Sequence, residues 1–156
     1  MIKIISTILA AIFIFTGCGF KVIKKSELIN FSIAEIDTSG DKRINYKLKN
    51  KLLLFSKNKD NKIIYLNIIS EKNKKIKEKN TNNEISKYEM TINISLEIKD
   101  DNGKLLDKIS ISEKSEYKVA KYHSTTRKNE KEEEAMLVNI LANKILDEIA
   151  FKLNDL

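Results

Sequence analysis

The pattern that decides the fold lies in residues 87–104, which read KYEMTINISLEIKDDNGK. Polar and apolar side chains alternate through the first two-thirds of this stretch, as in a strand with one buried and one exposed face. Asn102-Gly103 then gives a hairpin signal, because both residue types tolerate positive φ. Apolar side chains of one parity follow and predict the returning strand, with a bulge or a strand end where Glu113 and Ser115 interrupt them.

The segment before this hairpin predicts two more strands with a helix between them. Residues 28–36 and 63–69 are rich in Ile, which favours strands. The second is apolar on both faces and is therefore expected at the centre of the sheet. Apolar residues recur at helical spacing over 42–57, which predicts an amphipathic helix. Residues 38–41, TSGD, supply the turn and the N-cap that this helix needs.

A second helix is predicted over residues 130–153. Asn129 is its expected N-cap, and the glutamates that follow place negative charge near the positive end of the helix dipole. The order of elements is thus β-α-β-β-β-α. A strand-helix-strand crossover makes its two strands parallel, whereas hairpins pair the later strands antiparallel. The sequence therefore predicts an α+β fold, a two-layer sandwich in which a mixed four-stranded sheet carries two helices on one face.

The N-terminal end is typical of an export signal. An uncharged, mostly apolar run over residues 4–15 follows one lysine and precedes small residues. It is shorter than the roughly 20 residues that a helix needs to cross a bilayer. The uncharged stretch continues to Phe20, so an uncleaved N-terminal anchor is the alternative. The predicted organisation is a signal peptide over 1–17, a tether over 18–27 and a single domain over 28–156.

Cys18 follows Thr16-Gly17 at the end of the apolar run, and this placement resembles the lipobox of bacterial lipoproteins. In that class the cysteine sulfur carries a lipid and the residue becomes the mature N-terminus. The resemblance implies that Cys18 is the lipidation site and that Gly19 permits sorting to the outer membrane. Several acyl chains would hold such a protein at the membrane durably, whereas one chain binds only marginally.

The composition removes most classes of enzyme. The chain has one Cys and one His, which excludes an internal disulfide, a thiolate zinc site and almost any Cys/His dyad. The sequence contains no glycine-rich nucleotide motif and no G-x-S-x-G. His123 lies in a polar, loop-like stretch without a second histidine as partner. We therefore predict no enzyme activity, no catalytic residue, no metal and no cofactor.

The net charge is +7, and all but two of the basic residues are lysines. The abundance of Lys, Ile and Asn is typical of an AT-rich coding bias, so this charge is weak support for a nucleic-acid partner. The chain lacks Trp, and Tyr65, Tyr88 and Tyr117 are expected at core or rim positions of strands. An RNA-binding face has little support on these grounds, and we predict no nucleic-acid partner.

Taken together, several segments are similar to the LPS-assembly lipoprotein (LptE) family. They are the GCGF sequence around Cys18, the β-α-β-β-β-α order, and the C-terminal segments 117–130, 133–137 and 150–153. The resemblance covers essentially the whole chain. It implies a lipoprotein on the periplasmic side of the outer membrane, anchored there by its N-terminal lipid. Such a protein plugs the LptD β-barrel, assists assembly of that barrel and binds lipopolysaccharide.

Lipopolysaccharide is anionic and carries acyl chains, so its binder needs exposed cations near apolar groups. Two lysine-rich segments qualify: the connection expected over 72–79 and the approach to the last helix over 121–131. The resemblance places the family's contacts in these two regions. The candidate contact residues are Lys77, Lys79, Arg127, Lys128 and Lys131. The competing interpretation is a set of solvated lysines that bind no ligand.

Two other functions remain open at the level of sequence. An auxiliary lipoprotein of another envelope lipid transporter would contact an inner-membrane or periplasmic channel instead of an outer-membrane barrel. An envelope hydrolase that uses paired carboxylates is more distant. With 22 acidic residues, chance pairs of carboxylates are common, and none lies in an apolar motif that would tune its pKa.

Overall fold

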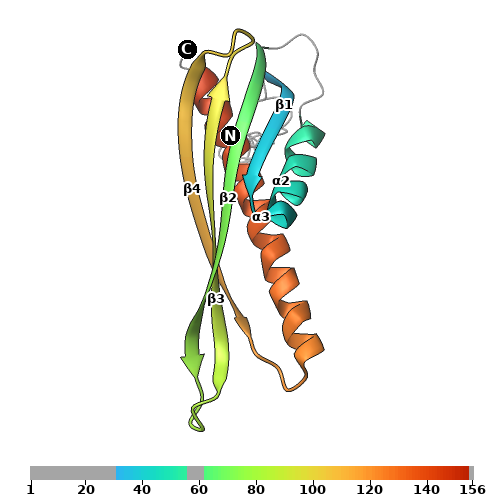
Figure 1. The fold of residues 1–156 in the computed structure, drawn as a ribbon, viewed down its shortest axis with the longest axis vertical. Coiled ribbons are helices and arrows are strands. Elements are labelled where there is room, and N and C mark those ends of the chain that lie inside the picture. The colour runs from blue at the N-terminus through green and yellow to red at the C-terminus, as the bar shows by residue number, and fades with distance from the viewer. Residues whose placement is uncertain (1–30, 56–61, 155–156) are drawn as a thin grey trace, which may run out of the picture.

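The computed structural model describes residues 31–55 and 62–154 (Figure 1). The elements follow in the order β1 Phe31–Gly40, α2 Lys42–Phe55, β2 Lys62–Lys79, β3 Ile85–Lys99, β4 Leu105–Lys118 and α3 His123–Asn154. This order and the mixed sheet confirm the predicted α+β fold. The predicted signal peptide, the tether with Cys18, and the outer ends of the first predicted strand and helix lie outside the described residues.

The sheet has the strand order β1-β2-β3-β4. β1 pairs parallel with β2, and β2, β3 and β4 pair antiparallel. β2 therefore has a neighbour on each side, as predicted. Only one of its faces is buried, however: Ile64, Leu66 and Ile68 lie inside, whereas Ile63 and Ile69 are about half exposed on the other face.

Both helices cover the same face of the sheet, and the hydrophobic core lies between the two layers (Figure 1). α2 contributes Ile44, Leu48 and Leu52, which recur at helical spacing and are fully buried. α3 contributes a longer apolar stripe, consisting of Leu137, Val138, Leu141, Ala142, Ile145, Leu146 and Ile149. Each buried aliphatic side chain contributes roughly 1.5–3 kcal/mol. These stripes therefore hold the helices to the sheet.

β1 meets α2 at Gly40, which lies against the backbone of β2. The φ of Gly40 is +94°, and a Cβ at this position would lie 1.9 Å from the carbonyl oxygen of Ser70, so only glycine fits. Asp41 is the N-cap of α2, because its Oδ1 accepts the backbone N–H groups of Arg43 at 2.9 Å and Ile44 at 3.0 Å. The cap is as predicted, but the residues expected to form a turn before it belong to β1.

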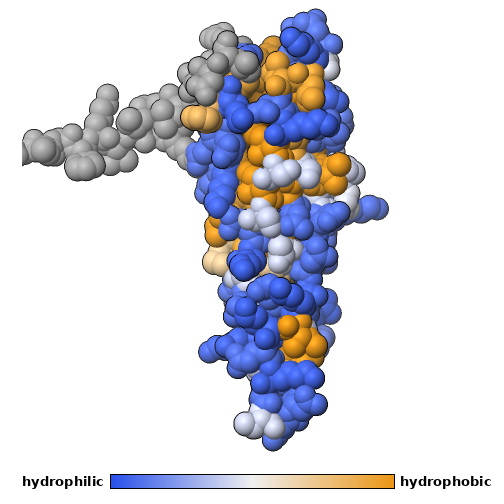
Figure 2. All heavy atoms as spheres, turned by 90° about the vertical axis from the view of Figure 1, so that its left-hand side faces the viewer, coloured by the Kyte–Doolittle hydropathy of each residue, from blue (hydrophilic) through white to orange (hydrophobic). Residues whose placement is uncertain are grey.

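The β2–β3 hairpin is longer than predicted. β1 pairs with β2 only as far as Ser70, but β2 continues to Lys79 and stays paired with β3. We call the part of this hairpin beyond Ser70, residues 71–93, the arm. Figure 1 shows the arm extending past the end of β1. On the face that Figure 2 shows, the surface of this half is mostly hydrophilic, with one hydrophobic patch.

The segment 72–79 is therefore part of a strand rather than a connection, which corrects the prediction. The physical reason is that β3 offers partners for its charges. Lys75 and Lys77 on β2 reach Glu89 on β3 at 2.8 and 3.3 Å. Opposite charges on facing strands stabilise pairing, so a lysine-rich sequence with low strand propensity still continues the sheet.

α3 begins at His123, about two turns earlier than predicted. The backbone N–H groups of Thr125 and Thr126 both donate to the carbonyl oxygen of Tyr122 at 3.1 Å. The hydroxyl of Thr126 in turn accepts the N–H of Ala120 at 2.9 Å. These bonds fix the start of the helix, and His123 is an exposed helix residue rather than part of a loop.

The predicted N-cap at Asn129 is consequently wrong. Asn129 lies inside α3 and donates from Nδ2 to the carbonyl oxygen of Lys118 at 3.0 Å. The glutamates that follow it lie beyond the first turn, which contains no acidic residue. Glu130, Glu133 and Glu134 therefore act through side-chain contacts with the sheet rather than through the helix dipole, whose effect falls off within the first turn.

The hairpin predicted at Asn102-Gly103 is present, but only Gly103 has a positive φ, at +78°. Asp100 closes the turn: its Oδ1 accepts the N–H groups of Asn102 at 3.0 Å and Lys104 at 2.8 Å. Along β4 the register remains unbroken at Glu113 and Ser115, so the predicted bulge is wrong. These polar residues face the helices: Glu113 pairs with Lys144, and Ser115 donates a hydrogen bond to Glu133.

Candidate functional site

Three cations lie along one face of the first half of α3. Arg127, Lys128 and Lys131, which we call the basic stripe, recur at helical spacing and are exposed. Together with Ser124, Glu132 and Ala135 they line a surface depression of about 620 Å³. The structure therefore brings together three of the five predicted contact residues on a single helix surface.

The positive charges of the basic stripe are largely unpaired. Neither Arg127 nor Lys131 forms an ion pair with another residue of 31–55 or 62–154. Lys128 lies 3.8 Å from Glu132, and both side chains are well exposed, so this pair contributes little. An anionic ligand that approaches this face would meet cations that need not first give up another partner.

The other two predicted contact residues are placed differently. Lys77 lies 3.3 Å from Glu89 and 3.2 Å from Glu116. Hydrogen bonds with Glu116 and Glu89 raise its pKa, so the charge of Lys77 is matched within the protein. Lys79 lies at the end of β2 and donates to Oδ1 of Asn83 at 3.0 Å.

Lys77 also lies on the face of the sheet that the helices leave open. Its partners Glu89 and Glu116 are adjacent in sequence to Met90 and Tyr117, whose side chains are buried in the core, and neighbouring side chains on a strand point to opposite faces. The basic stripe belongs to the helix layer. The two predicted groups thus lie toward the same end of the molecule (Figure 1) but on different layers.

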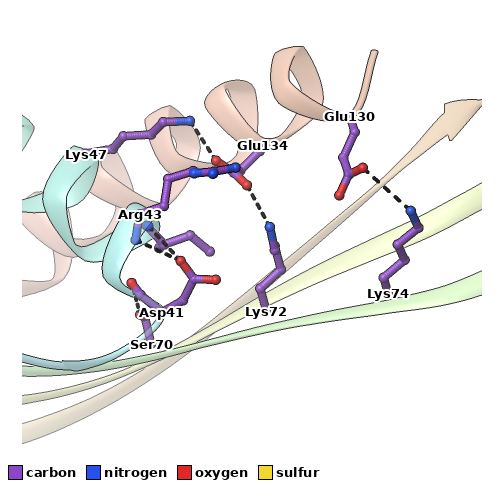
Figure 3. A network of polar contacts seen from close by, with 9 residues as sticks. Asp41, Arg43, Lys47, Ser70, Lys72, Lys74, Glu130 and Glu134 are labelled. Carbon is purple, nitrogen blue, oxygen red and sulfur yellow. Dashed lines mark hydrogen bonds and ion pairs between the residues drawn. The ribbon is translucent and has the colours of Figure 1, made fainter. Parts of the chain in front are cut away.

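A second set of charged residues connects the arm to α3 (Figure 3). The side chain of Glu134 on α3 is only 2% exposed. Its carboxylate accepts hydrogen bonds from the ammonium groups of Lys47 on α2, at 2.7 Å, and Lys72 on β2, at 2.9 Å. Lys74 of β2 lies 3.6 Å from Glu130 of α3. Burial of Glu134 opposes its ionisation, but the hydrogen bonds from Lys47 and Lys72 outweigh burial and lower its pKa.

Lys72 and Lys74 were expected among the lysines of a connection, and their glutamate partners were not predicted. The spacing contains a signal for this arrangement: Glu130 and Glu134 are four residues apart on a helix, and Lys72 and Lys74 are two apart on a strand. Each pair therefore shares one face of its element. The pattern does not predict how far β2 extends alongside α3.

Other kinds of site find no support within the described ranges. In these ranges no group of three or more His, Cys, Asp or Glu side chains is arranged to hold a metal ion. None of the described helices is long and apolar enough to cross a membrane. The charged surface around the first half of α3 is therefore the strongest candidate functional site.

Comparison with known proteins identifies solved structures with a similar fold. No protein-family model and no curated protein matches the chain. Among solved structures, rare lipoprotein B from Shewanella oneidensis is similar with a TM-score of 0.58 and 15% identity, over 78% of this chain and 97% of that one. The chain has the fold of a bacterial lipoprotein.

A candidate lipoprotein from Caulobacter crescentus gives a similar result. Its TM-score is 0.57 at 17% identity, and the match covers 84% of this chain and 95% of the other. Both matches span nearly the full length of the other chains. At this level of identity the likeness concerns the fold.

Proposed function

We propose that this protein is a lipid-anchored component of the Gram-negative outer membrane that binds lipopolysaccharide and both plugs and helps assemble an LptD-type β-barrel. In this proposal Cys18 carries the lipid and the folded domain lies on the periplasmic side. The observation that carries the proposal is the fold, which it shares with bacterial lipoproteins over most of the chain. The predicted lipidation site supports the same class.

The basic stripe supports lipopolysaccharide binding. Phosphate groups bind arginine and lysine through charge-assisted hydrogen bonds, and arginine does so in a bidentate manner. Arg127, Lys128 and Lys131 are exposed, and apolar surface lies close by in the sequence, at Tyr122 and Met136, which are 67% and 43% exposed. A ligand with both phosphates and acyl chains matches this combination.

The open face of the sheet supports a role inside a barrel. Five uncharged, small polar residues lie together in the middle of this face: Thr91, Asn93 and Ser95 on β3, and Ser110 and Ser112 on β4. The lumen of an outer-membrane barrel is polar. A sheet face with small hydroxyl and amide side chains can approach such a wall without burying unpaired charges, which would be costly.

Charge reversal tests the ligand-binding part of the proposal. The full lipoprotein, purified in detergent, is titrated with fluorescently labelled lipopolysaccharide. Reversal of the basic stripe, with Arg127, Lys128 and Lys131 all changed to Glu, should weaken binding about tenfold or more, since three favourable contacts become repulsive. The matched control changes three other exposed lysines to Glu: Lys104, Lys114 and Lys118.

Both triple variants change the net charge by the same amount, so a general loss of attraction affects them equally. The proposal predicts that only the stripe variant loses most of its affinity and that both variants unfold at nearly the wild-type temperature, because exposed charges contribute little to stability. Equal binding by the stripe variant and the wild type would assign these residues to the solvated surface.

A further inference from the structure

α3 consists of two halves that are held to the sheet by different forces. Within residues 137–149 seven apolar side chains are buried, whereas residues 123–136 bury none. The only buried residues of the first half are Thr126 and Glu134, which are polar. We call residues 123–136 the flap.

The flap covers Met90 and Tyr117, but none of its own apolar side chains is buried, and its specific ties to the strands beneath it are polar. Glu134 binds Lys72, and Glu130 lies 3.6 Å from Lys74, which is 38% exposed. Glu133 accepts the hydroxyl of Ser115 at 2.5 Å. Apart from the buried pair of Glu134, these are partly exposed single contacts, and together they contribute less than the seven buried apolar side chains of the second half. The flap is therefore expected to open at a lower free energy than the second half of α3.

The surface beneath the flap combines cations with apolar groups. The Nζ of Lys74 lies 4.0 Å from the ring centroid of Tyr88 and 5.2 Å from that of Tyr117. The two rings are 5.7 Å apart. Next to them on β3, Met90 is fully buried, and Tyr117 is only 3% exposed. When the flap moves away, two lysines adjoin two aromatic rings and a methionine on the sheet face that the arm forms with the end of β4.

We propose that this face, formed by the arm and the end of β4, is a covered binding site for the phosphate groups and acyl chains of an anionic lipid. In the free protein the carboxylates of the flap occupy its lysines. Lys72 and Lys74 bind the phosphates, and Tyr88, Met90 and Tyr117 contact the chains. The identity of the lipid as lipopolysaccharide rests on the proposed function. The basic stripe lies on the flap itself, so a lipid bound there is positioned to compete with the carboxylates of the flap for the lysines of the arm.

The competition follows from the charges. In the free protein Glu130 pairs with Lys74, and Glu134 pairs with Lys72 as well as with Lys47. A phosphate carries more charge than a carboxylate and offers more acceptor oxygens, so it can replace these partners. The pair between Lys74 and Glu130 is more exposed than the pairs of Glu134. Displacement is therefore expected to begin at Glu130.

Hydrogen exchange of the full lipoprotein in detergent tests the flap directly. Amides of residues 127–136 should exchange at least about tenfold faster than those of 141–150, because local opening of the flap exposes less apolar surface. Their exchange should rise between about 50 and 500 mM NaCl, as salt screens the partly exposed pairs. Addition of lipopolysaccharide should raise the exchange of the flap further. Uniform protection along α3 that is insensitive to salt and lipid would overturn the proposal.

Binding measurements test the role of the carboxylates. Glu130→Gln should tighten the binding of labelled lipopolysaccharide about two- to fivefold, the range expected when one partly exposed ion pair no longer competes. Glu148→Gln is the matched control, since it removes the same charge from an exposed position in the second half of the same helix. Lys74→Gln should weaken binding, although the basic stripe is intact.

The outcomes separate this inference from the proposed function. If wild-type protein binds lipopolysaccharide, but Glu130→Gln and Lys74→Gln bind like Glu148→Gln, the covered site is refuted and the proposed function stands. If wild-type protein binds no lipopolysaccharide at all, both fail. Tighter binding by Glu130→Gln, with weaker binding by Lys74→Gln, supports the covered site.

Discussion

Lys72 on β2 and Glu134 on α3 are 62 residues apart in the sequence, yet their side chains meet at 2.9 Å. Lys47 on α2 binds the other oxygen of the same carboxylate at 2.7 Å. A single buried glutamate thus joins the arm and both helices. Figure 3 shows the contacts of this junction. Along α3 it separates the buried apolar stripe, which begins at Leu137, from the charged first half, which carries the basic stripe.

Removal of this carboxylate should destabilise the domain. We expect Glu134→Gln to lower the free energy of unfolding by about 1–3 kcal/mol, because Lys47 and Lys72 lose a buried partner but can still reach water. Urea unfolding of the full lipoprotein measures the change. The control Glu148→Gln should stay within about 0.5 kcal/mol of wild type. A Glu134→Gln variant as stable as this control would show that the junction contributes nothing.

The domain should lose stability in acid. The pKa of Glu134 is lowered because lysine hydrogen bonds outweigh burial. A carboxyl group with a lowered pKa in the folded state stabilises the fold above its unfolded pKa, about 4.5, and this contribution is lost as pH falls through the folded value. Hydrogen bonds to lysines or to backbone N–H groups also lower the pKa of Glu78, Glu89, Glu97 and Asp107.

Urea unfolding at several pH values measures this dependence. The free energy of unfolding should be nearly constant just above about pH 4.5 and should fall below it. Glu134→Gln should show a smaller fall than wild type, since it lacks one of the titrating groups. Stability that rises with acidification would contradict the pairing of these carboxylates.

Two glycines with positive φ should respond very differently to substitution. Gly40→Ala places a Cβ 1.9 Å from the Ser70 carbonyl oxygen, whereas a Cβ at Gly103 meets nothing within 4 Å. We expect Gly103→Ala to cost about 1 kcal/mol for the left-handed backbone alone. Gly40→Ala should cost about 3 kcal/mol or more, because the β1–β2 contact must also shift. Equal melting temperatures of the two variants would refute the close approach at Gly40.

Lipidation is tested at Cys18. Cys18→Ser should abolish incorporation of labelled palmitate and should release the protein from the membrane fraction, because no thioether can form. Gly19→Asp is the informative companion variant: by resemblance to bacterial lipoproteins it should keep the lipid but shift the protein to the inner membrane. Palmitate incorporation by Cys18→Ser would show that the lipid is attached elsewhere.

The strands, helices and fold class could be predicted because the core residues follow clear periods. Tyr88 to Ile98 alternate with a period of two, and Leu137 to Ile149 recur with the period of a helix. Burial of these residues decides the fold, and burial is what such patterns record. The N-cap at Asp41 was likewise predictable, since its hydrogen bonds are local.

The arm and the flap could not be predicted, because distant pairs of charges hold them. Lys74 gives no sign in the local sequence that Glu130 will neutralise it, and Lys77 looks as free as Lys131. Lysine and glutamate are compatible with strand, helix and loop, so local propensity decides little for them. Of the predicted contact residues, Lys77 has its charge matched by Glu89 and Glu116, whereas the basic stripe keeps its charge largely unpaired in the folded protein.

Affinity capture of the full lipoprotein from detergent-solubilised envelopes tests the proposed role at an outer-membrane barrel. Mass spectrometry should identify an LptD-type β-barrel as the main partner, and the level of that barrel should fall when the lipoprotein is depleted. Recovery of a periplasmic or inner-membrane lipid channel instead, or of a lone monomer with the barrel level unchanged, would contradict the account.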